Sequence, residues 1–102
     1  MAYLHIAETL QCYSCLSFLQ SDINTCLNLD DQTEVVTCAD GASCVEVGVD
    51  VKSADGITYT NQRFCDATNE ACNNLKGIYK SDEIRKCRTC STDKCNNSTL
   101  SR

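Results

Sequence analysis

Residues 87–96 read CRTCSTDKCN and place three cysteines in the spacing C-x2-C-x4-C. Earlier cysteines bring the total to 10 among 102 residues, while tryptophan and proline are absent. A chain of this length forms one domain and buries only a modest share of its surface. A cysteine content this high is typical of small secreted proteins, because disulfides persist in oxidising compartments. The even number lets every cysteine pair, so we predict no free thiol.

Two C-x2-C pairs, Cys12/Cys15 and Cys87/Cys90, also fit the pattern of a zinc ribbon. A structural zinc site takes four ligands and would leave six cysteines without a role. A redox C-x2-C pair needs an exposed thiol at a helix start within an α/β pattern, which the sequence lacks. We therefore favour structural disulfides and predict no metal and no cofactor.

The clearest local pattern is the alternation of valine with polar residues over 45–52, VEVGVDVK. Residues 53–56, SADG, form a turn signal, and ITYTNQRF follows. This pattern predicts a β-hairpin over 45–64 with one apolar and one polar face. We expect shorter strands at 10–15 and 33–38 and a loop at 16–25. Residues 73–86 suggest a loose hairpin, or one helical turn within SDEIRK.

Four features resemble the lymphocyte antigen-six/urokinase-receptor (LU) family, which shares the three-finger fold of snake neurotoxins. They are LQCYSC at 10–15, the Cys44-Val45 step, Cys65-Asp66 after the hairpin, and CSTDKCN at 90–96. Many members have adjacent cysteines where Arg88 and Thr89 separate Cys87 from Cys90, and the looser spacing resembles invertebrate-type members. The resemblance implies an all-β, small, disulfide-rich three-finger fold with five disulfides.

The resemblance also implies a pairing of the cysteines, which spacing alone leaves open. It gathers the bridges at the bases of three excursions, residues 16–25, 45–64 and 73–86. Asn96 corresponds to the family's terminal asparagine, a structural residue whose amide can hydrogen-bond backbone groups. The implied pairs are Cys12–Cys44, Cys15–Cys26, Cys38–Cys65, Cys72–Cys87 and Cys90–Cys95.

The ends of the chain carry further signals. Residues 96–99, NNST, contain two overlapping N-glycosylation sequons, and we predict Asn97 as the glycosylated residue because Asn96 is expected to be buried. The small residues Asn97 and Ser98 also suit attachment of a glycolipid anchor. We interpret residues 10–97 as a single LU domain and 98–102 as a tail, truncated before an anchor signal. Residues 1–9 are an expression remnant or an extra edge strand, and the native precursor is expected to carry a signal peptide.

Charge is distributed unevenly. Residues 1–56 have a net charge of −8 and residues 57–102 a net charge of +3, for a total of −5 that argues against nucleic-acid binding. A basic run could form a basic edge for a partner, or simply a solvated face. This run consists of Lys76, Lys80, Arg85, Lys86 and Arg88.

Catalysis has no good candidate. The single histidine, His5, lies in the expected remnant, and adjacent acids such as Asp30-Asp31 are ordinarily solvated. We therefore predict a protein that is not an enzyme and that recognises a membrane receptor, channel or adhesion protein. Loops on a rigid scaffold concentrate recognition residues, and exposed aromatic groups anchor interfaces. The partner-binding candidates are Phe18, Leu19, Ile23, Ile57, Tyr59, Ile78, Tyr79 and Lys80, with packing in the hairpin favoured for Tyr59.

The resemblance implies an extracellular glycoprotein of the cell membrane, held at the surface by a glycosylphosphatidylinositol (GPI) anchor. A freely secreted ligand or toxin-like modulator of a receptor is the alternative. A hydrophobic tail encoded after Arg102 would favour the first, and a stop codon near Ser98 the second. The ectodomain of a growth-factor receptor, which has a similar terminal cysteine motif, is a third interpretation.

Overall fold

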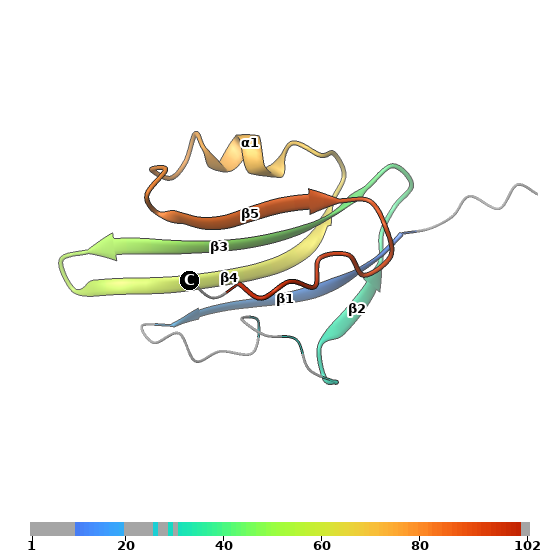
Figure 1. Ribbon diagram of the computed structural model, residues 1–102, viewed down its shortest axis with the longest axis horizontal. Coiled ribbons are helices and arrows are strands. Elements are labelled where there is room, and N and C mark those ends of the chain that lie inside the picture. The colour runs from blue at the N-terminus through green and yellow to red at the C-terminus, as the bar shows by residue number, and fades with distance from the viewer. Residues whose placement is uncertain (1–9, 20–25, 27–28, 30, 101–102) are drawn as a thin grey trace, which may run out of the picture.

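The computed structural model describes residues 10–19, 26, 29 and 31–100. They form a five-stranded sheet in the order β2-β1-β4-β3-β5, in which all pairings are antiparallel, and one short helix, α1. Figure 1 shows a long central hairpin with α1 beside β5 and the C-terminal segment running back over the sheet. The protein is thus small and mostly antiparallel β, with five disulfides.

The central hairpin consists of β3 (Ser43–Ser53) and β4 (Gly56–Asp66). Ser53 pairs with Gly56 across a two-residue turn. Gly56 has φ +123°, a backbone conformation that side-chain-bearing residues rarely adopt. The predicted hairpin and its turn are confirmed, and the first three valines of β3 are buried.

Strand β1 (Gln11–Leu19) joins two neighbours. Its first residues pair with β2 (Glu34–Thr37), and residues 15–19 pair with β4. The short strands expected at 10–15 and 33–38 are present. The prediction that a loop begins at Leu16 is wrong, because Leu16–Leu19 continue β1 and pair with β4. The alternation of apolar and polar residues at 10–15 was too short to predict that the strand extends this far.

The third excursion is not a hairpin, which corrects the prediction for residues 73–86. Its chain forms α1 (Ala71–Leu75), then turns, and then β5 (Ile84–Cys90). The predicted helical turn within SDEIRK is wrong as well, since Ile84 begins a strand. Strand β5 pairs with β3 rather than with the preceding segment, so pairing to the central hairpin determines its conformation.

All ten cysteines form disulfides. The bonds have the same pairing that the family resemblance implies. Three of them meet near one end of the hairpin, where Cys12, Cys38 and Cys44 form a buried cluster with Cys65, Cys90 and Cys95 packed against it. The bonds join Cys12 to Cys44, Cys15 to Cys26, Cys38 to Cys65, Cys72 to Cys87 and Cys90 to Cys95.

Candidate binding site

The hairpin has two faces with different chemistry, because successive residues of a strand point to opposite sides. The first, which we call the valine face, carries Val45, Val47 and Val49, all buried. The second, the charged face, carries Glu46 of β3 between Arg63 of β4 and Arg88 of β5, which are its direct cross-strand neighbours. The prediction of one apolar and one polar face holds, but the polar face is also buried at its centre.

Glu46 is the centre of the charged face. Its carboxylate accepts hydrogen bonds from Arg63 Nη1 at 2.9 Å and from Arg88 Nε at 2.6 Å. Arg63 and Glu46 have side chains with no exposed surface, whereas Arg88 remains partly exposed. The backbone N–H and the hydroxyl of Ser98 also donate to the two carboxylate oxygens. Each buried charge therefore has both an opposite charge and hydrogen bonds, which burial requires.

These contacts determine the ionisation of the pair. Burial by itself would raise the pKa of Glu46, but hydrogen bonds from Ser98 and Arg88 and the charge of Arg88 outweigh it and hold the pKa below its ordinary value. Burial lowers the pKa of Arg63, and the charge of Glu46 opposes this effect. An arginine remains protonated despite such a shift. The pair is thus ionic at neutral pH.

Arg85 makes a third ion pair on this face, with Asp50. It lies at an irregularity in the β3–β5 register and reaches back across β3 at Gly48. Its Nε donates to Asp50 Oδ1 at 2.9 Å, and its Nη1 donates to Asn61 Oδ1 and to the Leu100 carbonyl. A Cβ at Gly48 would lie 2.6 Å from Arg85 Nη1, so a larger residue there would require the guanidinium to move.

The chain after β5 covers the charged face. The buried Asn96 accepts from the Tyr13 N–H and donates to the carbonyls of Tyr13 and Val45, each at 3.0 Å. This is the structural role that the resemblance implies for Asn96. Leu100 is fully buried. Residues 98–100 are therefore packed against the domain, which corrects the interpretation of position 98 as the start of a tail.

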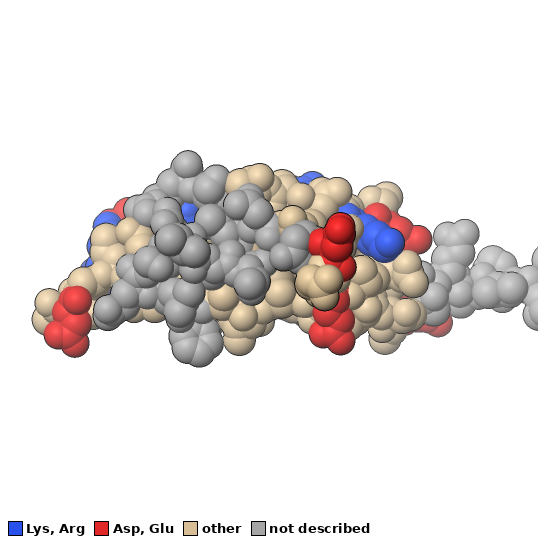
Figure 2. Space-filling model, turned by 90° about the horizontal axis from the view of Figure 1, so that it is seen from below, with Lys and Arg blue, Asp and Glu red and all other residues tan. Residues whose placement is uncertain are grey.

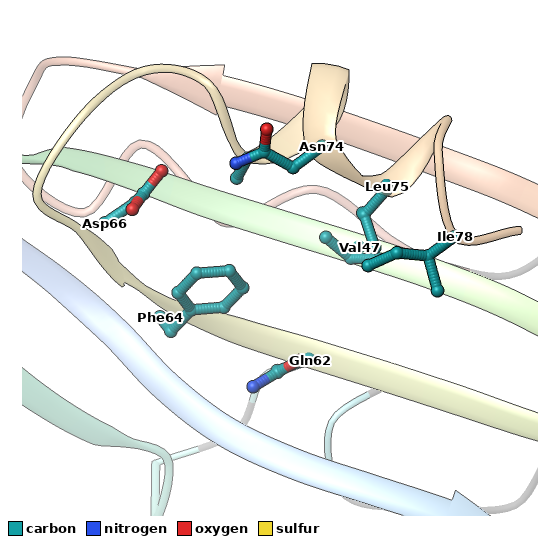
Figure 3. Close-up of a pocket in the computed structure, with 8 residues that line it drawn as sticks. Val47, Gln62, Phe64, Asp66, Asn74, Leu75 and Ile78 are labelled. Atoms are coloured by element: carbon teal, nitrogen blue, oxygen red, sulfur yellow. The ribbon is translucent and has the colours of Figure 1, made fainter.

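The valine face carries a pocket of about 260 Å³. One wall is the sheet and the other is α1 with the turn that follows it (Figure 3). Asp66 and Asn74 lie toward one end of the pocket, while Val47, Leu75 and Ile78 lie toward the other. The site therefore combines an apolar part with an acidic end. Its remaining lining residues are Gln62, Phe64 and Ala71.

Exposed apolar side chains extend this site. Ile78 at the pocket is 71% exposed, and Leu16 is 54% exposed. Leu16 pairs directly with Gln62, a lining residue, so the two side chains share a face of the sheet. Exposed apolar residues that gather around a pocket often mark an interaction site. We call the pocket together with Leu16 the pocket face.

The structure separates the predicted binding residues. Ile78 lines the pocket, whereas Tyr79 is half-buried and packs against the valines. Tyr59 and Ile57 are half-buried on β4, and Lys80 is exposed. The other three candidates, Phe18, Leu19 and Ile23, lie outside the described side chains. Only the backbone is described at positions 18 and 19, and Ile23 belongs to residues 20–25, which are not described. Among the candidates whose side chains are described, Ile78 lies on the valine face and Ile57 and Tyr59 lie on the opposite face of the hairpin, so these do not form one surface.

The expected basic edge is not continuous. Arg85 and Arg88 form ion pairs with Asp50 and Glu46, and Lys86 Nζ donates to the Thr99 carbonyl. Lys76 and Lys80 remain exposed. The sequence placed these cations in one run, but their acidic partners come from β3, which lies beside β5 only in the folded sheet. On the face shown in Figure 2, the described acidic and basic side chains lie in small separate groups.

The sequence did not point to Glu46, Arg63, Leu16 or Leu100 as parts of a site. The only available signal was the alternation of Glu46 with buried valines, which predicts a polar face but not its burial. Two groups of three cysteine sulfurs lie within 4.8 Å, as a metal site would require. Every one of these sulfurs is in a disulfide and therefore is not a thiolate, the form that binds metal.

Comparisons of the chain with protein-family models, with curated proteins and with solved structures found no match. Within the part of the chain that is described, no helix has the length and apolar character needed to cross a membrane. The dense set of disulfides is consistent with an extracellular protein.

Proposed function

We propose that the chain is an LU domain with a three-finger fold and that it acts as a non-enzymatic recognition module outside the cell. The observation that carries this proposal is the pocket face, where Ile78 and Leu16 remain exposed beside an open pocket. The disulfides fix the sheet that positions them. A rigid scaffold with exposed apolar groups suits binding of a protein partner.

The disulfide arrangement supports the family assignment. Bridges lie at the bases of the three excursions, and the buried Asn96 ties the C-terminal segment to β1 and β3. The second finger is the β3–β4 hairpin, and the third contains α1 and β5. The separation of Cys87 from Cys90 supports an invertebrate-type member of the family.

The proposed partner is a membrane receptor, channel or adhesion protein, and the domain is held at the cell surface by a GPI anchor. Attachment at Asn97 or Ser98 would require removal of Leu100, which is fully buried, and we therefore place the attachment beyond Leu100. Asn97 is exposed and remains the proposed glycosylation site. Asn96 is not available for glycosylation, because its amide makes three hydrogen bonds to backbone groups.

Recognition can be tested by photo-crosslinking on living cells. The oxidised domain, carrying a biotin and a photoreactive group, is compared with the same protein after reduction and alkylation. We expect the folded domain to enrich a discrete membrane protein. An excess of unlabelled domain should reduce this enrichment. Equal capture by the folded and the alkylated protein would contradict the proposal. Release of the native protein from cells by a phosphatidylinositol-specific phospholipase would separate anchoring from free secretion.

A further inference from the structure

The pocket on the valine face has an unequal distribution of polar groups. Its apolar part is formed by Val47, Phe64, Leu75 and Ile78, whereas Asp66 supplies a carboxylate at one end. A volume of about 260 Å³ lies below the range of about 300–1,000 Å³ that is usual for sites of drug-sized ligands. The pocket is therefore suited to one long side chain rather than to a larger small molecule.

Asp66 has no charge partner in the described part of the chain. The ion pairs there involve Lys52, Arg63, Arg85 and Arg88, and none of them includes Asp66. Its carboxylate accepts one hydrogen bond, from the Thr68 hydroxyl at 3.2 Å. A carboxylate offers about four acceptor positions, so Asp66 can still receive a cation.

We propose that this pocket binds a long basic side chain, lysine or arginine, of the protein partner. The methylene stem of such a side chain packs on apolar surface while its charged end stays at a polar group. Here the stem contacts Phe64 and Leu75, and the cation reaches Asp66. This inference rests on the proposed function and names the chemistry that the partner brings.

The surroundings of the pocket indicate a protein rather than a free amine. Ile78 at the pocket and Leu16 on the same face of the sheet both expose apolar surface. A free amine would leave this surface uncovered, whereas residues on either side of a bound lysine would cover it. The site thus favours a basic residue with apolar neighbours.

The test uses capped peptides and nuclear magnetic resonance titration of the folded, isotope-labelled domain. The probes are acetyl-Leu-Lys-Leu-amide, the same peptide with norleucine or glutamate in place of lysine, and n-butylamine. We expect saturable shifts at Val47, Gln62 and Leu75. The lysine peptide should bind about two- to fivefold more tightly than the norleucine peptide, the range of an exposed ion pair.

Two variants locate the charge. Asp66→Asn keeps an oxygen that can accept from Thr68 and should abolish the preference for lysine over norleucine. Asp55→Asn removes an exposed acid at the hairpin turn and should leave the preference unchanged. Three results would overturn the inference: no saturable shift at millimolar peptide, equal binding of the lysine and norleucine peptides, or n-butylamine binding as tightly as the lysine peptide.

The same variant separates this inference from the proposed function. If Asp66→Asn captured the partner on cells as strongly as the wild-type domain, the lysine site would be wrong and the recognition module would stand. If the wild-type domain captured no partner specifically, both the lysine site and the recognition module would be wrong.

Discussion

Arg63 and Glu46 form an ion pair at 2.9 Å, and neither side chain has any surface exposed to solvent. The two residues lie opposite each other on β4 and β3, and the C-terminal segment covers them through Ser98. Such a pair adds little net stability compared with a well-packed apolar pair, but loss of one member leaves an uncompensated buried charge. The domain therefore depends on both members being present.

Glu46→Gln should lower the free energy of unfolding by about 3–5 kcal/mol, because Arg63 stays charged without its partner. The measurement is denaturant unfolding with all disulfides intact. Lys52→Ala is the matched control, since the Lys52–Asp82 pair is exposed and its loss should cost less than about 1 kcal/mol. Equal costs for the two variants would show that burial of the Glu46 pair has no energetic consequence.

The pKa of Glu46 also predicts a dependence of stability on pH. Because the folded protein holds this pKa below its unfolded value, the stabilisation is complete above the ordinary glutamate pKa of about 4.3. It is lost as the pH falls through the lower, folded pKa. The difference in unfolding free energy between wild type and Glu46→Gln should therefore shrink below about pH 4.3. A difference that stays constant from pH 7 to pH 2 would contradict this assignment.

The burial of Leu100 predicts that the C-terminal segment contributes to stability. Leu100→Ala should lower the free energy of unfolding by about 2–5 kcal/mol, the usual cost of truncating a buried leucine. Its exposed neighbour provides the control, and Thr99→Ala should change stability by less than about 0.5 kcal/mol. If both variants unfold like wild type, residues 98–100 do not pack as described.

Adjacent asparagines give another matched comparison. Asn96→Ala would leave the Tyr13 N–H and the carbonyls of Tyr13 and Val45 without their partner. The bond to the Val45 carbonyl is buried, and leaving that group unsatisfied should cost about 1–3 kcal/mol, to which the part-buried Tyr13 groups add a smaller amount. Asn97→Ala, at an exposed position, should be nearly neutral in protein made without glycans. A thermal or denaturant unfolding series that shows equal effects would contradict the role of Asn96.

The sequence predicted the features that depend on local pattern. Alternation of valine with polar residues predicted the hairpin, and Gly56 after Asp55 located its turn. It did not predict that Glu46 would be buried, because that depends on where residues 96–100 return after β5. Helix α1 was missed for a related reason: five residues are too few to show a helical repeat.

The pocket face was only partly predictable. Ile78 was a candidate because it is an apolar residue between lysines, and the structure places it at the pocket. Leu16 and Gln62 are far apart in sequence and become neighbours only through the β1–β4 register. Tyr79 looked equivalent to Ile78 in sequence, but it packs toward the valines instead. The direction in which a side chain points within a short turn depends on tertiary packing, and the sequence pattern does not predict it.

The central claim is that the pocket face binds the partner, and cell-surface binding of one variant tests it most directly. Flow cytometry would compare wild type with Ile78→Ser, and with Val35→Ser as a control that removes an exposed apolar residue from β2. We expect Ile78→Ser to weaken binding at least about fivefold, the effect of losing about 1 kcal/mol at an interface, while Val35→Ser binds like wild type. Unchanged binding by a correctly folded Ile78→Ser variant would contradict the claim.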